Sequence, residues 1–143
     1  MTLTTAPPNL RQRSERMRTP LLTAASLTAA TLALHVRDPH VTHSWGVCPL
    51  YAVTGIYCPG CGGLRGVNDL TNGHVVQAAS SNILLVLVLP FAAVFFVRWA
   101  SGAWTGREVR VVPALPRPVV SALVVLVVVF TVARNLPGSW LAP

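Results

Sequence analysis

Three long apolar runs dominate the chain, and polar segments that contain arginine separate them. Residues 19–36 and 78–97 contain no Asp, Glu, Lys or Arg, and residues 118–133 form a shorter run dense in Val and Leu. Because an α-helix rises about 1.5 Å per residue, a run of about 20 apolar residues crosses the hydrocarbon core of a bilayer. The pattern predicts a transmembrane helix over each of these three ranges.

The remaining segments predict the domain organisation. Residues 1–18 are polar and basic, and we interpret them as a disordered or surface-lying tail that precedes a single membrane domain over residues 19–143. Residues 37–77 form a long loop between the first two spans. Inside the second span, Pro90 lacks a backbone donor, which predicts a kink at that point.

Composition supports the membrane assignment. Of the 143 residues, 52% are hydrophobic and only 10% are charged, whereas soluble domains carry about 25% charged residues. The apolar content excludes a disordered chain, and so few charges do not cover the surface of a soluble monomer. The lipid bilayer is therefore the first expected partner of this protein.

The distribution of charge predicts the orientation. All eleven basic residues are arginine, and with four acidic residues they give a net charge of +7. Cytoplasmic loops of membrane proteins carry an excess of basic residues, which predicts an inner-membrane protein with its N-terminus in the cytoplasm and residues 37–77 outside. No nucleic-acid-binding motif accompanies the charge, so we expect no nucleic-acid partner. Two groups of four arginines lie on the predicted cytoplasmic side: Arg11, Arg13, Arg16 and Arg18, then Arg98, Arg107, Arg110 and Arg117. 

Arg117 and Arg134 bracket the third span. Long basic side chains at the ends of a transmembrane helix usually extend toward the lipid headgroups. We expect both guanidinium groups to do so here.

The loop over residues 37–77 holds all three cysteines of the chain, Cys48, Cys58 and Cys61. Pro59 and Gly60 form a turn signal between the last two, and such a turn can bring both sulfurs to one side. Apolar residues then recur at helical spacing, which predicts a short half-helix before the second span. The fold class predicted is thus an all-α membrane protein with three transmembrane helices and a cysteine-bearing loop and half-helix between helices 1 and 2.

Two polar features are predicted within and after the half-helix. Arg65 and Asp69 are four residues apart, so they share a helix face and can form an ion pair. Gly73 is placed to end the half-helix. Asn82, the one strongly polar side chain of the second span, is expected to bond to a neighbouring helix rather than to a ligand.

The cysteines admit three kinds of chemistry. A disulfide that involves Cys58 would act as a structural staple, as is usual outside the cytoplasm. Zinc would take Cys58 and Cys61 with Cys48 as a third ligand, and the fourth would be His43, His40 or His74. Thiol–disulfide exchange would use Cys58 and Cys61 as the redox-active pair.

The combined motif resembles a bacterial integral-membrane family catalogued as domain of unknown function 2752. The residues that carry the resemblance are Cys48-Pro49, Thr54-Gly55, Cys58-Pro59-Gly60-Cys61-Gly62, Arg65, Gly73 and Asn82. The resemblance implies a membrane protein with a shared cysteine site, and it implies no activity. Within the site we assign structural roles to Pro59, Gly60, Gly62, Arg65, Asp69, Gly73 and Asn82.

These observations favour a non-enzymatic role. The sequence contains no Ser/His/Asp arrangement, P-loop or dinucleotide-binding motif. We therefore predict a small membrane subunit with a structural or partner-binding role, whose partner is another membrane protein or a second copy of the chain. The alternatives are a membrane thiol–disulfide oxidoreductase and a zinc-stabilised membrane protein.

Overall fold

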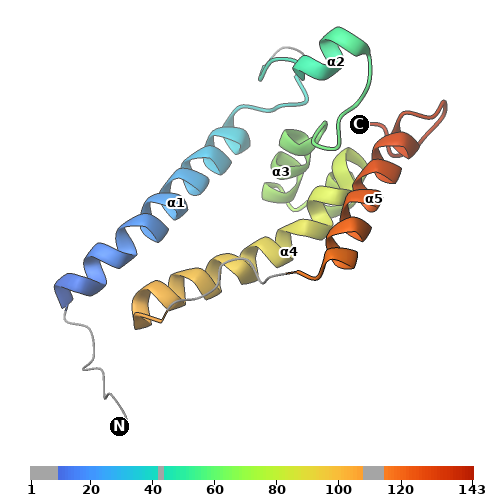
Figure 1. The fold of residues 1–143 in the computed structure, drawn as a ribbon. Helices are drawn as coiled ribbons and strands as arrows, with labels where there is room; N and C mark the ends of the chain where they lie inside the picture. The colour runs from blue at the N-terminus through green and yellow to red at the C-terminus, as the bar shows by residue number, and fades with distance from the viewer. Residues whose placement is uncertain (1–9, 42–43, 108–114) are drawn as a thin grey trace.

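The structure is a computed structural model that describes residues 10–41, 44–107 and 115–143 (Figure 1). Within these ranges all regular structure is helical, which confirms the all-α class. Three of the helices are long and apolar enough to cross a membrane, as predicted. The helices are α1 (Leu10–Val36), α2 (Pro49–Thr54), α3 (Gly63–Thr71), α4 (Val75–Thr105) and α5 (Arg117–Arg134). 

Helix α1 begins earlier than the apolar pattern indicates. The expected tail is helical from Leu10 onward and continues without interruption into the span, while residues 1–9 lie outside the described residues. Arginine, glutamine and glutamate are good helix formers, and Arg11 pairs with Glu15 one turn later at 3.6 Å. The charged residues before residue 19 therefore predict where the transmembrane part of α1 begins, but the helix itself begins earlier.

The interruption of α4 lies at Asn82 and not at Pro90, where it was predicted. Asn82 has extended backbone angles, with φ −163° and ψ 95°, whereas the backbone stays helical at Pro90. The Asn82 Oδ1 atom accepts a hydrogen bond from the backbone N–H of Leu85 at 3.0 Å. This is the bond of a helix N-cap, so Asn82 starts a new helical segment inside α4.

Helix α3, the predicted half-helix, packs closely on the first turns of α4. The contact relies on glycine: a Cβ atom at Gly66 would lie 3.0 Å from the side chain of Leu85 and 3.4 Å from the carbonyl oxygen of Ala78. Ala78 is fully buried at this contact. Asn68 fastens α3 to the end of α1 as well, because its side chain donates to the carbonyl oxygen of Leu34 at 2.7 Å.

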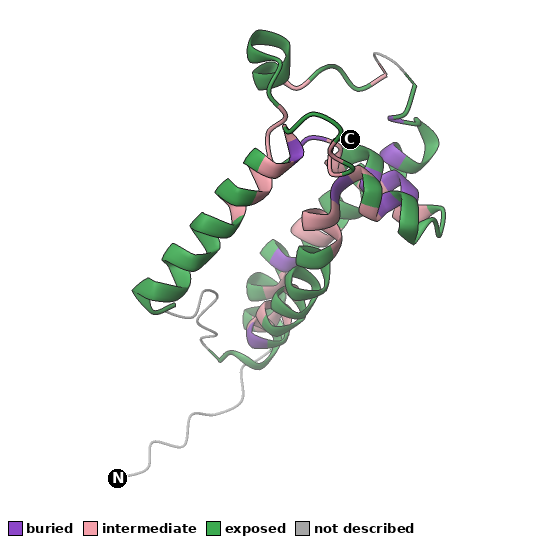
Figure 2. Ribbon diagram, turned by 90° about the vertical axis from the view of Figure 1, so that its right-hand side faces the viewer, coloured by how far each residue is buried: buried purple, intermediate pink, exposed green. Residues whose placement is uncertain are grey.

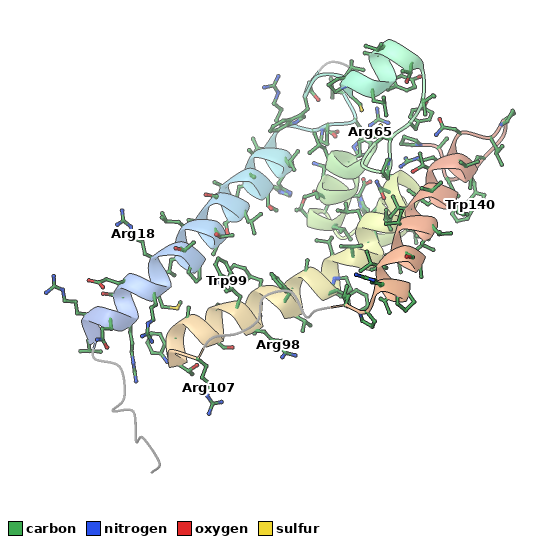
Figure 3. All side chains as sticks on the ribbon, in the orientation of Figure 1. Arg18, Arg65, Arg98, Trp99, Arg107 and Trp140 are labelled. Carbon is green, nitrogen blue, oxygen red and sulfur yellow. The ribbon has the colours of Figure 1, made fainter. Side chains whose placement is uncertain are left out.

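The helices place a group of arginines at one end of the molecule and the cysteine-bearing segment at the other. Figure 1 shows the start of α1 and the end of α4 at one end, with α2 and α3 at the other. The Arg13 guanidinium lies over the ring of Trp104, 5.4 Å from its centroid, which joins α1 to α4 at the basic end. Arg18, Arg98 and Arg107 lie toward the same end (Figure 3).

Most of the apolar helical surface is exposed within the monomer. The most apolar windows of α1, α4 and α5 are 11%, 0% and 6% buried, and Figure 2 shows α5 exposed along most of its length. Apolar side chains that no part of the chain covers require an apolar solvent. The helices therefore present a surface suited to a lipid bilayer.

Candidate functional site

The three cysteine sulfurs converge on one point. The Sγ atoms of Cys58 and Cys61 are 3.3 Å apart, and those of Cys48 and Cys58 are 3.7 Å apart. All three sulfur atoms lie within 4.8 Å of one another, and all three residues are free thiols. The expected approach of Cys58 to Cys61 is confirmed, and Cys48 joins them from ten residues upstream.

Short elements on either side of the cysteines produce this convergence. Cys48 is the N-cap of α2, and Pro49 occupies the first turn, where its missing N–H is tolerated. Gly55 ends α2 in the left-handed region, with φ +70°, and the chain turns back toward Cys58. The backbone N–H of Cys61 then bonds to the carbonyl oxygen of Cys58 at 3.1 Å, which closes the predicted turn.

Gly62 joins this turn to α3 at a point that requires glycine. Its φ is +77°, and it is the N-cap of α3. A Cβ atom there would collide with the carbonyl oxygen of Ser81 and would lie 2.8 Å from Pro143. The close approach of the turn to the break in α4 therefore depends on the absence of a side chain. At the other end of α3, Gly73 follows the C-cap with φ +78°.

The carbonyl oxygens of the cysteine turn are held by two side chains from other helices. Asn82 donates to Pro59 at 2.9 Å and to Cys61 at 3.0 Å. Arg134 donates to Cys58 at 3.0 Å, to Pro59 at 3.3 Å and to Cys61 at 3.0 Å. The side-chain donors of α4 and α5 thus fix the backbone from which two of the sulfurs project.

Arg134 does not extend toward the headgroups, so that prediction was wrong. Its side chain is fully buried, and its guanidinium lies 5.1 Å from the ring centroid of Phe130. The next residue continues the attachment, because Asn135 accepts from the backbone N–H of Tyr57 at 2.8 Å and donates to the carbonyl oxygen of Tyr57 at 2.9 Å. In the sequence, the only indication of these contacts is an arginine next to an asparagine at the end of an apolar run.

Asp69 makes other contacts than the predicted ion pair with Arg65. Its Oδ2 atom accepts from the hydroxyl of Ser81 at 2.9 Å, and its Oδ1 atom lies 3.4 Å from Nε2 of His40. Among the described residues, Arg65 makes no ion pair. Asp69 is buried, and its contacts with Ser81 and His40 connect α3 to α4 and to the loop after α1.

Two of the histidine candidates for a fourth metal ligand, His40 and His74, are described, and neither is brought to the sulfurs. Among the described residues, the group that can hold a metal consists of the three cysteines alone. His40 is occupied elsewhere, with Nδ1 at 2.8 Å from Asp38 and Nε2 facing Asp69. His74 is the N-cap residue of α4. His43 lies outside the described residues.

The thiols differ in their electrostatic surroundings. The backbone N–H of Tyr51 and the Cys61 thiol stabilise the Cys48 thiolate and lower its pKa. Burial raises the pKa of Cys61 to about 12, and its contact with the Cys58 thiol adds to the shift. Cys48 at the edge of the site is thus the more readily ionised of these two groups.

A cavity of about 510 Å³ adjoins the cysteines. Cys48 and Cys61 form part of its wall, together with the rings of Tyr51 and Tyr57, which stack with their centroids 4.5 Å apart. Arg65 contributes the one charged side chain of the lining. The site therefore combines three converging sulfurs with an open volume that a small molecule can enter.

Comparison with known proteins identifies the segment that carries this site. No curated protein and no solved structure matches the chain. A family model matches residues 48–96, which include all three cysteines, α3, and Asn82. The match covers about a third of the chain and ends before α5, so it leaves out Arg134 and Asn135. Residues 48–96 therefore match the model of a family described as a protein of unknown function (DUF2752).

Proposed function

We propose that this protein is a zinc-stabilised membrane protein in which Cys48, Cys58 and Cys61 bind one metal ion. The observation that carries the proposal is the convergence of the three sulfurs, at 3.3 and 3.7 Å for the two shortest pairs. Tetrahedral zinc binds thiolate sulfur at about 2.3 Å, which spaces its sulfur ligands about 3.8 Å apart. The three side chains thus need little movement to become ligands.

The charge around the site supports a metal–thiolate centre. Zn²⁺ with three thiolates carries a net charge of −1. Arg134 brings a fully buried positive charge to the backbone of Cys58 and Cys61, and among the described residues no carboxylate lies within ion-pair distance of it. Buried charges are normally paired, and an anionic metal centre would provide the missing partner.

The metal would have a structural role. It would tie the start of α2 to the turn before α3, and Asn82 and Arg134 hold that turn against α4 and α5. The assembled end of the molecule would then serve as an attachment surface for another membrane protein or a second copy of the chain. The exposed apolar faces of the three long helices leave room for such a partner within the bilayer.

The arginine distribution supports a cytoplasmic-membrane location with the cysteine centre outside. Arg11, Arg13 and Arg18 lie in the first third of α1, and Arg98 and Arg107 lie near the end of α4, toward the end of the molecule opposite α2 and α3 (Figure 3). Basic residues favour the cytoplasmic side. Outside the cytoplasm thiols tend to oxidise, and bound metal would keep these three reduced.

Metal analysis of the purified protein tests the proposal. The chain is purified in detergent without added chelator, and zinc and free thiols are measured on the same sample. We expect about one zinc per chain, and a loss of most of it in each of the variants Cys48→Ser, Cys58→Ser and Cys61→Ser. The variant His74→Gln is the matched control and should keep its metal. A disulfide in most chains together with no bound metal would overturn the proposal.

Thiol–disulfide exchange is the second candidate, and the 3.3 Å separation of the Cys58 and Cys61 sulfurs favours it. In this reaction a Cys58–Cys61 disulfide would accept two electrons and two protons from an external dithiol, which becomes a disulfide. The same purified sample distinguishes the two functions. A redox-active pair would be metal-free, would be reduced by a mild dithiol within minutes and would reoxidise reversibly.

A further inference from the structure

The cavity beside the cysteines reaches two of the three proposed zinc ligands. Cys48 and Cys61 lie in its wall, whereas Cys58 is not part of the lining. A metal bound by the three sulfurs would therefore border the cavity. The described histidine candidates lie outside the sulfur group, so we assign the fourth coordination position to a molecule in the cavity.

The cavity favours an anion. Its lining contains no Asp or Glu, and Arg65 is its one charged side chain. Arg65 has no ion-pair partner among the described residues, because Asp69, one turn later, is occupied by Ser81 and His40. Figure 3 shows Arg65 at the α2 and α3 end of the molecule. A guanidinium group in such a position binds carboxylate well, since its planar N–H donors match the two oxygens.

We propose that the cavity binds a small thiol that carries a carboxylate group. Its sulfur would occupy the fourth position on the metal, and its carboxylate would bind Arg65. This inference rests on the proposed zinc site, because the metal provides the contact for the sulfur. On binding, the thiol releases its proton to solvent and its sulfur displaces a water molecule from the metal, so no electrons are transferred.

The other walls fit such a ligand. Tyr51 and Tyr57 form a stacked aromatic pair, and Trp45 and Leu64 add further apolar surface. Cavities of about 300–1,000 Å³ accommodate small molecules, and this one has about 510 Å³. A short aliphatic chain between the thiol and the carboxylate would lie against the apolar wall while its two ends meet the metal and Arg65.

Cobalt substitution provides the test, because absorption from thiolate to Co²⁺ increases with the number of thiolates bound. The full chain in detergent is loaded with Co²⁺ and titrated separately with 3-mercaptopropionate, 2-mercaptoethanol and propionate. We expect 3-mercaptopropionate to raise the absorption by about a third, as a fourth thiolate joins three. It should act at roughly a tenfold lower concentration than 2-mercaptoethanol, and propionate should add no absorption.

Variants of Arg65 test the carboxylate contact. In Arg65→Gln the preference for 3-mercaptopropionate over 2-mercaptoethanol should disappear, and Arg65→Lys should retain part of it, while Co²⁺ binding itself is unchanged in both. Arg98→Gln, at the opposite end of the molecule, is the control and should behave as the wild type.

The outcomes separate this inference from the proposed function. Failure of the protein to bind Co²⁺ through thiolates would overturn the metal site and the ligand together. A spectrum of three thiolates that 3-mercaptopropionate leaves unchanged would overturn the ligand alone and leave the metal site in place. A preference for 3-mercaptopropionate that persists in Arg65→Gln would overturn the assignment of Arg65 as the carboxylate contact.

Discussion

Asn82 and Arg134 donate hydrogen bonds to the same acceptor, the carbonyl oxygen of Cys61, and each bond is 3.0 Å long. They also share the carbonyl oxygen of Pro59. Residues 52 positions apart in the chain thus converge on one turn. Because a carbonyl oxygen has two lone pairs, each of these two acceptors can bond to α4 and α5 at the same time.

Replacement of Arg134 by alanine should destabilise the protein severely. The change removes three hydrogen bonds from a charged donor and leaves buried carbonyl oxygens with fewer partners. Each hydrogen bond of this kind contributes about 1.5–3 kcal/mol, so we expect a loss of at least about 3 kcal/mol and a clearly lower melting temperature in detergent.

The matched control for Arg134 is Arg117, the exposed arginine at the other end of α5. Arg117→Ala should leave the melting temperature nearly unchanged. Arg134→Lys should recover only part of the stability, because an ammonium group keeps the charge but cannot reproduce the fixed geometry of the guanidinium. Equal melting temperatures for Arg134→Ala and Arg117→Ala would contradict the role assigned to Arg134.

The two roles of Asn82 can be separated with two substitutions. Asn82→Ala removes both the cap to Leu85 and the donors to the turn. Asn82→Asp keeps a capping oxygen but places a carboxylate against two carbonyl oxygens. We expect Asn82→Asp to lower thiol-bound metal and melting temperature at least as much as Asn82→Ala. If Asn82→Asp had the metal content and melting temperature of the wild type, the capping bond to Leu85 alone would account for the role of Asn82.

The fold was predictable from the sequence where its cause is local. The three spans follow from runs of apolar residues, and the half-helix follows from the spacing of Leu64, Val67 and Leu70 after a Pro-Gly turn. The sequence predicts a kink at Pro90, because proline lacks a backbone N–H donor. In the structure the helix breaks at Asn82, where the side chain bonds to a turn 21 residues upstream, and that partner is not visible in local sequence.

The sequence predicts the cysteines of the candidate site, but it does not predict the side chains from other helices that hold them in place. Cys58 and Cys61 are brought together by a turn of two residues, so their proximity follows from the sequence. The part played by Arg134 depends on how α5 packs against the turn, 73 residues before it in the chain. Its position at the end of an apolar run is equally suited to contact with headgroups, and only the tertiary arrangement decides between the two.

Gly62 and Gly63 are neighbours that should respond differently to alanine. At Gly62 an added Cβ would collide with Ser81 and the backbone is left-handed, whereas nothing lies within 4 Å of a Cβ at Gly63. We expect Gly62→Ala to reduce the yield of folded protein strongly. Gly63→Ala should change stability by less than about 1 kcal/mol. Size-exclusion chromatography in detergent measures the yield of folded protein, and the melting temperature measures the change in stability. Similar profiles and melting temperatures for the two variants would contradict the close approach at Gly62.

Reporter fusions test the orientation that the arginine distribution supports. Fusions after residue 70 and at the C-terminus should report the outer compartment, and a fusion after residue 107 should report the cytoplasm. The basic ends of α1 and α4 then lie on the same side, as the contact of Arg13 with Trp104 requires. A cytoplasmic signal from the fusion after residue 70 would place the cysteine centre inside and invert the proposal.

Alkylation of the metal-free protein should distinguish Cys48 from Cys61. Only the thiolate reacts, and its fraction rises with pH until the pH exceeds the pKa. The pKa of Cys48 is lowered by the backbone N–H of Tyr51, whereas burial raises that of Cys61 to about 12. With chelator present, we therefore expect iodoacetamide to label Cys48 first at pH 7–8, and its rate to level off at a lower pH than that of Cys61.

Peptide mass spectrometry over a pH series gives both rates, and the same series in denaturing detergent is the control. The two rates should become similar there, because unfolding removes the surroundings that separate the two pKa values. Equal labelling of Cys48 and Cys61 in the folded protein would show that burial does not protect Cys61.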